Sequence, residues 1–84
     1  MNAIIIIANQ KQQLFAARSA DGEYVVFESL GPGDITIGDV VNNKDFYRMK
    51  REVYRNITRD ESFEVFVHKM CASLYQANKL CLLK

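Results

Sequence analysis

The sequence predicts a mainly β protein: a small antiparallel barrel of five or six short strands followed by a C-terminal α-helix. Apolar, β-branched segments of strand length alternate with polar or glycine-rich turns at intervals of roughly 8–12 residues. The pair Asp21-Gly22 separates two of these segments, and the C-terminal residues repeat with a helical period. A chain of 84 residues that is 49% hydrophobic and 25% charged fits one domain spanning residues 1–84.

The first three strands are predicted around the Asp-Gly pair. Four consecutive isoleucines favour a strand over residues 2–8, and an unbroken apolar run predicts burial on both faces or a central barrel position. A polar turn leads to a second strand over residues 14–18. Asp21-Gly22 then predicts a tight two-residue hairpin turn, because these residues tolerate the positive φ angles that it requires. The third strand spans about residues 23–30.

The middle of the chain is less regular. Residues 31–34, Gly-Pro-Gly-Asp, end the third strand in a turn. Ile35-Thr36-Ile37 alternates like a strand, and Gly38 is expected to bend or bulge it before Val40-Val41. Residues 43–51 are compatible with a short helix or an irregular crossover, and their composition favours one helical turn.

A second hairpin and a helix complete the predicted fold. Strands are expected near residues 53–58 and 63–68, and in the latter Phe66 and His68 alternate with apolar residues of the opposite face. Ser73 and Gln76 form a capping-box pattern, which predicts an amphipathic helix over about residues 73–83. This helix either plugs the barrel or leaves an apolar patch for a partner. The leucines in question are Leu74, Leu80, Leu82 and Leu83.

Part of this pattern also occurs in a known family. The chain has an aromatic strand around Phe15, the Asp21-Gly22 hairpin, a valine-rich strand over residues 24–27, and Gly38-Asp39-Val40-Val41. Over about a third of the chain, from Lys11 to Val41, this order resembles the cold-shock type of OB-fold domain. The predicted barrel is OB-like or SH3-like, and the resemblance implies the OB type. The chain also resembles small bacterial barrel proteins, which implies no activity.

The resemblance departs from the family where that family stacks on bases. Its glycine-aromatic alternation on the second strand is replaced here by Leu14-Phe15-Ala16-Ala17, so most of the stacking platform is missing. The residue order Val65-Phe66-Val67-His68 matches the family's other strand motif. Because it lies too late in the chain to fill the same place, we treat this match as a coincidence.

Charge is distributed unevenly along a chain whose net charge is only +1. Residues 1–43 carry two cationic and five acidic side chains, whereas residues 44–59 carry six cationic and two acidic ones. Interleaved aromatic residues could stack on unpaired bases while the cations follow the phosphates. The alternative is a solvated basic segment whose aromatic residues belong to the core. The predicted nucleic-acid-binding residues are Lys44, Tyr47, Arg48, Lys50, Arg51, Tyr54 and Arg55.

No catalytic constellation stands out, and we expect a protein that is not an enzyme and has no cofactor. His68, Cys71 and Cys81 are three potential metal ligands, but a structural zinc site needs four, so we expect core cysteines and no metal. Asp34 and Asp39 are interpreted as turn residues. The leading hypothesis is weak binding of single-stranded RNA or DNA. The alternative is an assembly module that binds itself or another protein through the C-terminal helix and charged faces.

The apolar run of residues 3–8 is too short for a membrane span or the core of a signal peptide. We therefore expect a cytoplasmic protein with reduced thiols and no membrane partner. A core this small encloses no large cavity, so no small-molecule substrate is expected.

Overall fold

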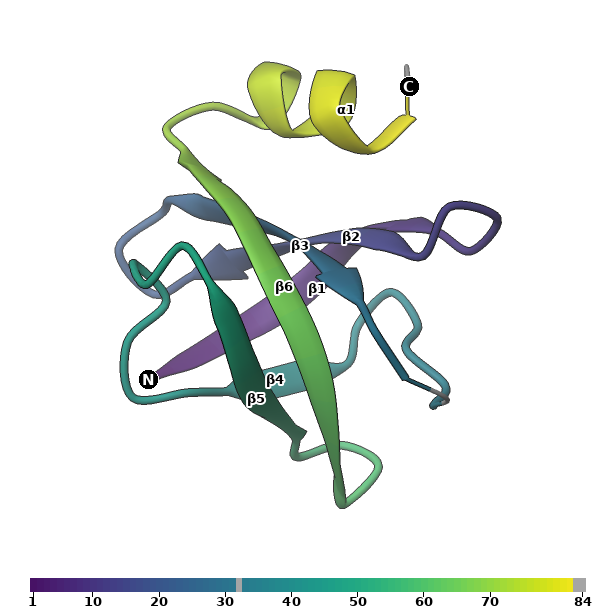
Figure 1. Cartoon of the computed structure of the whole chain (residues 1–84). Helices are drawn as coiled ribbons and strands as arrows, with labels where there is room; N and C mark the ends of the chain where they lie inside the picture. Colours follow the sequence, from purple (N-terminus) through teal and green to yellow (C-terminus); the bar gives the residue numbers. More distant parts are fainter. Residues whose placement is uncertain (32, 83–84) are drawn as a thin grey trace.

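Six antiparallel strands form a closed barrel, and one helix lies against its outer surface (Figure 1). The computed structural model describes residues 1–31 and 33–82. The elements are β1 (Asn2–Asn9), β2 (Leu14–Ser19), β3 (Tyr24–Ser29), β4 (Val40–Asn42), β5 (Arg51–Asn56), β6 (Glu61–Cys71) and α1 (Leu74–Leu82). The predicted fold class, a mainly β antiparallel barrel with a C-terminal helix, is confirmed.

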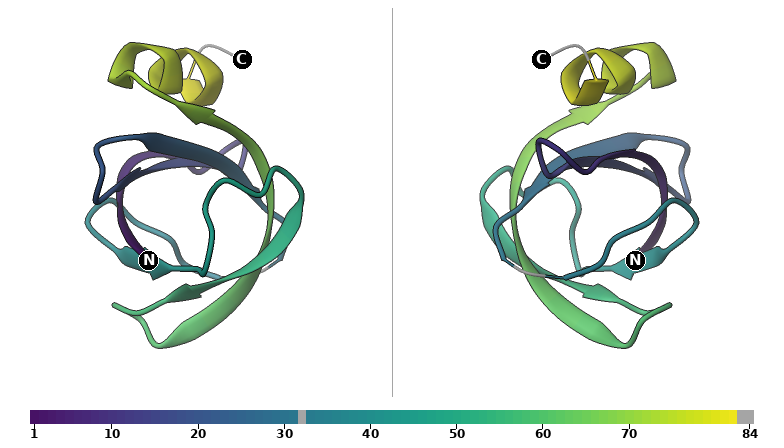
Figure 2. Two further views of the ribbon diagram at one scale, coloured as in Figure 1. Left: turned by 90° about the vertical axis from the view of Figure 1, so that its left-hand side faces the viewer. Right: turned by 90° about the vertical axis from the view of Figure 1, so that its right-hand side faces the viewer.

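The strand order around the barrel is β1-β2-β3-β6-β5-β4, and β4 pairs again with β1. Two consecutive triplets, β1–β3 and β4–β6, each run up and down; we call them the first half and the second half. Because β4 returns to lie beside β1, the order β4-β1-β2-β3 is a Greek key. Figure 2 shows the strands closing around the barrel, with α1 over one side. Closure leaves no unpaired edge strand.

The barrel interior is filled mainly by aromatic rings. Phe27 from the first half and Phe46 from the connection before β5 each pack edge-on against Tyr54, with ring centroids 5.2 Å apart in both pairs. Phe15 of β2 stacks on Phe27, and Phe63 of β6 completes the group. Large rings span the small barrel, so residues distant in sequence share one core.

A second, smaller core lies between the outer surface of the first half and α1. Ala77 and Cys81 of the helix pack onto Ala16 and Val26 of the sheet, and all four are buried. The backbone N–H of Gln76 donates to the Ser73 Oγ at 3.2 Å, as the capping pattern predicts. At the other end, the Asn9 side chain donates to the Cys81 carbonyl at 2.6 Å. Residue 83 of the predicted helix, Leu83, lies outside the described residues.

β1 is buried on both faces only near α1. Ile5 is fully buried in the barrel interior, and Ile6 and Ile7 contact the core under the helix. Ile4 instead lies half-exposed on the outer surface, because α1 does not reach this part of the strand. Burial on both faces, the first of the two alternatives for this run, therefore fails at Ile4, and a position within the barrel, the second alternative, applies to β1.

The first hairpin is present, but its turn has three residues rather than two. The Gly22 N–H donates to the Ser19 carbonyl at 3.0 Å, and the Ser19 N–H donates to the Glu23 carbonyl at 2.8 Å. Of the Asp-Gly pair, only Gly22 has a positive φ, at 82°. This is a type I turn closed by a left-handed glycine, the common three-residue solution.

Two predictions for the middle of the chain are wrong. Ile35 enters the barrel core while Ile37 is exposed, so residues 35–37 form a connection and not a strand. Residues 43–50, which we call the crossover, contain no helical turn. Phe46 is fully buried, and the Tyr47 N–H donates to the Asp45 carboxylate at 2.8 Å. Insertion of the Phe46 ring into the barrel replaces the helix with the irregular alternative.

Candidate nucleic-acid interface

The candidate interface is the outer surface of β5 and β6 together with the adjoining part of β3. We call it the β5–β6 face. Side chains alternate across a strand, so residues at every second position of β5 share the outside. Arg51 lies opposite Phe66, Val53 opposite Glu64, and Arg55 opposite Ser62. The exposed or half-exposed residues of this face are Glu28, Arg51, Val53, Arg55, Ser62, Glu64, Phe66, His68 and Lys69.

Tyr54, one of the predicted stacking residues, does not belong to this face. It occupies an inward position of β5 and is fully buried among the aromatic rings of the barrel. Its hydroxyl has no hydrogen-bond partner among the described residues, and burial raises the pKa of the Tyr54 phenol well above its ordinary value. The structure therefore removes Tyr54 from the predicted set, and the alternative of a core aromatic residue applies to it.

Tyr47 is 46% exposed, but its hydroxyl is engaged. It donates to the Asp21 carboxylate at 3.0 Å, and this bond raises the pKa of Tyr47 to about 12. Asp21 also accepts from the Ser19 hydroxyl at 2.5 Å, and the bonds from Ser19 and Tyr47 lower the pKa of the Asp21 carboxyl. Tyr47 thus fastens the crossover to the first hairpin.

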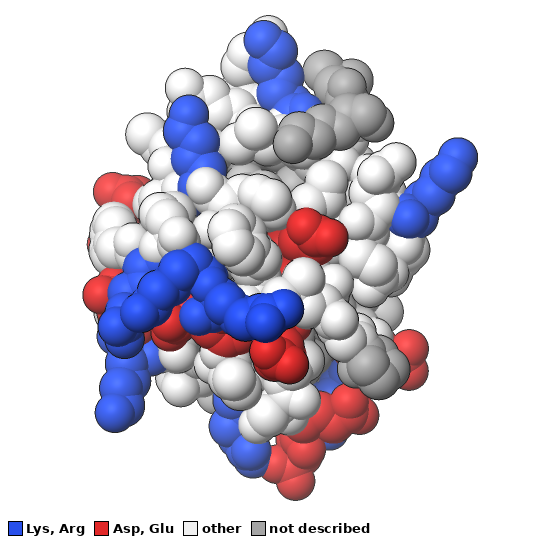
Figure 3. All heavy atoms as spheres, viewed as in Figure 1, with Lys and Arg blue, Asp and Glu red and all other residues white. Residues whose placement is uncertain are grey.

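The crossover displays three of the predicted cations, Lys44, Arg48 and Lys50, and all three are exposed. Within residues 1–31 and 33–82 none of them forms an ion pair. The backbone beneath them is held, since the Lys50 carbonyl accepts from the Val67 N–H of β6 at 3.0 Å. Figure 3 shows a band of cationic side chains around the crossover and β5, with acidic side chains beside it.

The two arginines of β5 have exposed acidic partners. Arg51 lies 3.7 Å from the Glu64 carboxylate, and Arg55 pairs with Asp60 in the turn before β6. All four side chains are more than half exposed, so these pairs contribute little stability and can exchange partners with a phosphate. Both predicted arginines therefore remain available on the β5–β6 face.

Arg59, by contrast, is tied into the fold. It donates to Asp39 at 2.9 Å, and the same carboxylate accepts from the Asn56 side chain at 2.9 Å and the Thr36 N–H at 3.1 Å. Asp39 is only 4% exposed. Burial alone would raise its pKa, but the bonds from Asn56, Thr36 and Arg59 together lower it. This network joins the connection before β4 to the end of β5.

Phe66, His68 and Lys69 are the members of the face that the sequence-based set omits. Phe66 is 41% exposed, and its ring centroid lies 5.1 Å from that of His68. Phe27 pairs with Val67 and Val26 with Lys69, so β6 carries one extra residue, His68, in a β-bulge. The bulge exposes two consecutive side chains, His68 and Lys69.

The predicted alternation of β6 already indicated this surface. Val65 and Val67 point into the barrel, and Phe66 and His68 point outward, as expected from the sequence. From the sequence, the late position of Val65-Phe66-Val67-His68 in the chain argues against a match with the cold-shock strand motif. In the closed barrel, however, β6 pairs directly with β3, so chain position does not determine which strands are neighbours.

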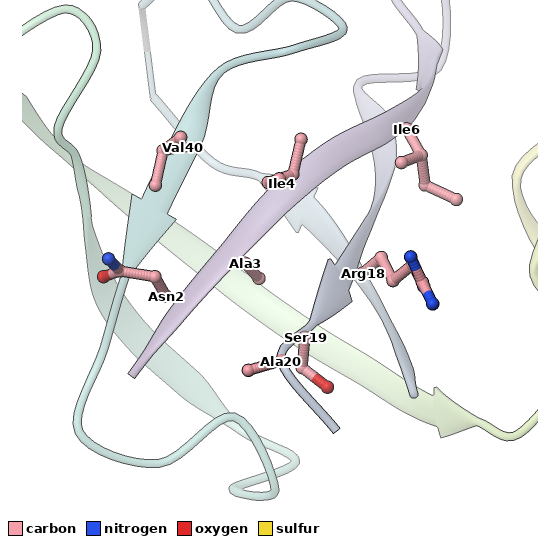
Figure 4. A pocket seen from close by; sticks show the side chains of 8 residues that line it. All are labelled: Asn2, Ala3, Ile4, Ile6, Arg18, Ser19, Ala20 and Val40. Atoms are coloured by element: carbon pink, nitrogen blue, oxygen red, sulfur yellow. The ribbon is translucent and has the colours of Figure 1, made fainter. Parts of the chain in front are cut away.

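A further hollow lies elsewhere, on the outside of β1. It has a volume of about 480 Å³, and Arg18 is the one charged residue in its lining. Figure 4 shows Ile4 of β1 between Val40 and Arg18, with Ile6 further along the same strand. In the strand order β1 is separated from β6 by two strands on either side, so this hollow is not part of the β5–β6 face.

Neither a metal site nor a membrane-spanning helix is found in the described part of the chain. It contains no group of three histidine, cysteine or acidic residues that could hold a metal ion. Cys71 and Cys81 are free and buried, and burial raises the pKa of Cys81 to about 11. None of its helices has the length and apolar character to cross a bilayer.

Comparison of the chain with protein families, curated proteins and solved structures finds no match.

Proposed function

We propose that the protein binds single-stranded nucleic acid on the β5–β6 face. One observation carries the proposal: an exposed phenylalanine, Phe66, lies directly opposite Arg51 and next to the imidazole of His68. Aromatic rings on a sheet surface stack on unpaired bases, and neighbouring cations neutralise the phosphates. The lysine and arginine residues of this face are Arg51, Arg55 and Lys69, and the crossover that leads into β5 adds the exposed Lys44, Arg48 and Lys50.

An unpaired strand fits this face better than a duplex does. The aromatic ring of Phe66 can stack only on a base that is free to leave its own stack, which favours single strands over paired ones. The same arrangement gives a role to Val65-Phe66-Val67-His68, the segment that matches the strand motif of cold-shock OB-fold domains. Its outward residues lie here on β6.

The acidic residues of the face limit its affinity. Glu28 and Glu64 lie among the cations, and each is paired, Glu28 with His68 at 3.2 Å and Glu64 with Arg51. A phosphate that binds Arg51 must displace Glu64. We therefore propose weak, strongly salt-dependent binding with a small number of phosphate contacts. The cytoplasmic location expected from the sequence stays a prediction.

The test is fluorescence anisotropy of a labelled uridine-rich oligomer in a salt series. Phe66→Ala should weaken binding by roughly 5- to 150-fold, since stacking contributes about 1–3 kcal/mol per base. The matched control is Tyr75→Ala, which removes an aromatic ring that is 70% exposed on α1 and should leave affinity unchanged. Absence of binding at low salt, or equal losses in the two variants, would contradict the proposal.

A second candidate function is assembly through α1. Leu74 and Leu82 are both nearly half-exposed on the helix, which leaves apolar surface for a second copy or another protein. The solution mass should then rise with concentration, and Leu74→Glu should abolish the rise. A strict monomer over the whole concentration range would exclude self-association.

A further inference from the structure

Phe66 lies between two charged residues of opposite sign, a cation on one neighbouring strand and an anion on the other. In the strand register it lies opposite Arg51 of β5 and also opposite Glu28 of β3. Directly opposed side chains of antiparallel strands have Cβ atoms about 4.5–5.5 Å apart. Arg51, Phe66 and Glu28 therefore form one row across three strands, with the aromatic ring between a cation and an anion.

This row would orient a bound nucleotide across the strands, with its phosphate on one side of Phe66 and the edge of its base on the other. A base stacked on Phe66 would have its phosphate on the β5 side, where Arg51 and Lys50 supply positive charge, because the phosphate is repelled by Glu28. The edge of the base would then point toward β3 and the Glu28 carboxylate. The exposed Watson–Crick edge of an unpaired base is what proteins read in single strands.

The Glu28 carboxylate has free capacity to accept hydrogen bonds. Its Oε1 lies 3.2 Å from the His68 Nε2, and its side chain is 43% exposed. No lysine or arginine of residues 1–31 and 33–82 pairs with it. An ionised carboxylate has about four acceptor positions and donates nothing, so one bond to His68 leaves most of them for a ligand.

We infer that the base stacked on Phe66 is preferentially guanine, read by the Glu28 carboxylate. Guanine presents two adjacent donors on its Watson–Crick edge, N1–H and N2–H, which match the two oxygens of a carboxylate. Adenine, cytosine and uracil each place an acceptor beside their donor, and that acceptor faces the negative charge. This inference rests on the proposed function and assigns its base preference.

The test compares three uridine-rich oligomers that differ at one central position, which is uridine, guanosine or inosine. The guanosine oligomer should bind about tenfold tighter than the all-uridine one, the discrimination typical of a bidentate contact. Inosine lacks the N2 amino group and should lose most of this gain. In Glu28→Gln the preference should fall to nearly one, while the all-uridine oligomer binds as well or better because a repelling charge is gone.

Glu64→Gln is the matched control, because it removes the other glutamate of the face, which lies opposite Val53 rather than Phe66. It should leave the guanine preference unchanged. Inosine binding as tightly as guanosine, or an unchanged preference in Glu28→Gln, would overturn the inference. If Phe66→Ala still weakens every oligomer in that case, the proposed function stands without the base preference. Failure of all oligomers to bind at low salt would overturn both.

Discussion

The two halves of the barrel differ in what covers their outer surfaces. The first half, β1–β3, carries α1, and Ala16 and Val26 on its outside are as buried as core residues. The second half, β4–β6, has no helix, and its β5–β6 face presents Phe66 and charged side chains to solvent. Both halves are antiparallel triplets with the same connectivity.

The difference shows that a helix and not the sheet decides which surface is available. A strand surface becomes core where α1 packs on it and stays exposed to solvent where nothing does. The apolar outward residues of the first half and the mixed, cationic residues of the second half correspond to these two outcomes. Each half can therefore be tested by changes that should affect only stability or only binding.

The largest effect is expected on the covered side. Ala77 of α1 is fully buried against the first half, so Ala77→Asp places an unpaired carboxylate in an apolar contact. The free energy of unfolding should fall by at least about 3 kcal/mol, measured by urea denaturation. Tyr75→Asp, on the exposed side of the same helix, should change it by less than about 0.5 kcal/mol. Similar losses in both variants would mean that α1 does not seal this surface.

The next largest effect concerns the network around Asp39, near the junction of the halves. Asp39→Asn removes the negative charge that faces Arg59 and leaves one acceptor oxygen where two accept from Thr36, Asn56 and Arg59. Unfolding free energy at neutral pH should fall by about 1–3 kcal/mol. An unchanged urea midpoint would show that these bonds carry no net stability.

The same carboxylate predicts a pH dependence. Because the pKa of Asp39 is lowered in the folded protein, the unfolded chain binds the proton more readily. The stability that this residue contributes is present above its unfolded pKa and is lost as pH falls through the folded value. Wild-type stability should therefore decline below about pH 5 more steeply than that of Asp39→Asn. Parallel acid titrations would contradict this sign.

A smaller effect separates two arginines on the two halves. Arg51→Gln, on the β5–β6 face, should weaken oligomer binding severalfold and reduce the slope of log affinity against log salt by about 0.7, the value for one phosphate on a single strand. Arg18→Gln, on the outside of β2, should change neither quantity. Equal effects would mean that binding follows net charge and not a defined surface.

The smallest effect is expected at Tyr54. Tyr54→Phe removes a buried hydroxyl that lacks a partner among the described residues, so stability should stay unchanged or rise by up to about 1 kcal/mol. Oligomer affinity should not change, because the ring lies inside the barrel. A loss of binding comparable to that of Phe66→Ala would restore Tyr54 to the interface.

Much of the fold follows from local sequence. The strand segments, both hairpins and the Ser73 cap were predicted because they depend on residues close together in the chain. The middle of the chain was predicted less well. The fate of residues 35–37 and of the crossover depends on where Ile35 and Phe46 enter the barrel, and this is a contact between distant segments.

The candidate site divides in the same way. The sequence by itself determined the cation-rich segment and the alternation that turns Phe66 and His68 outward, since both are properties of one short stretch. Only the tertiary structure decided that Tyr54 is core, that Arg59 belongs to a buried network, and that Phe66 lies between Arg51 and Glu28. Strand register and closure bring these residues together, and both arise from pairing between strands far apart in the chain.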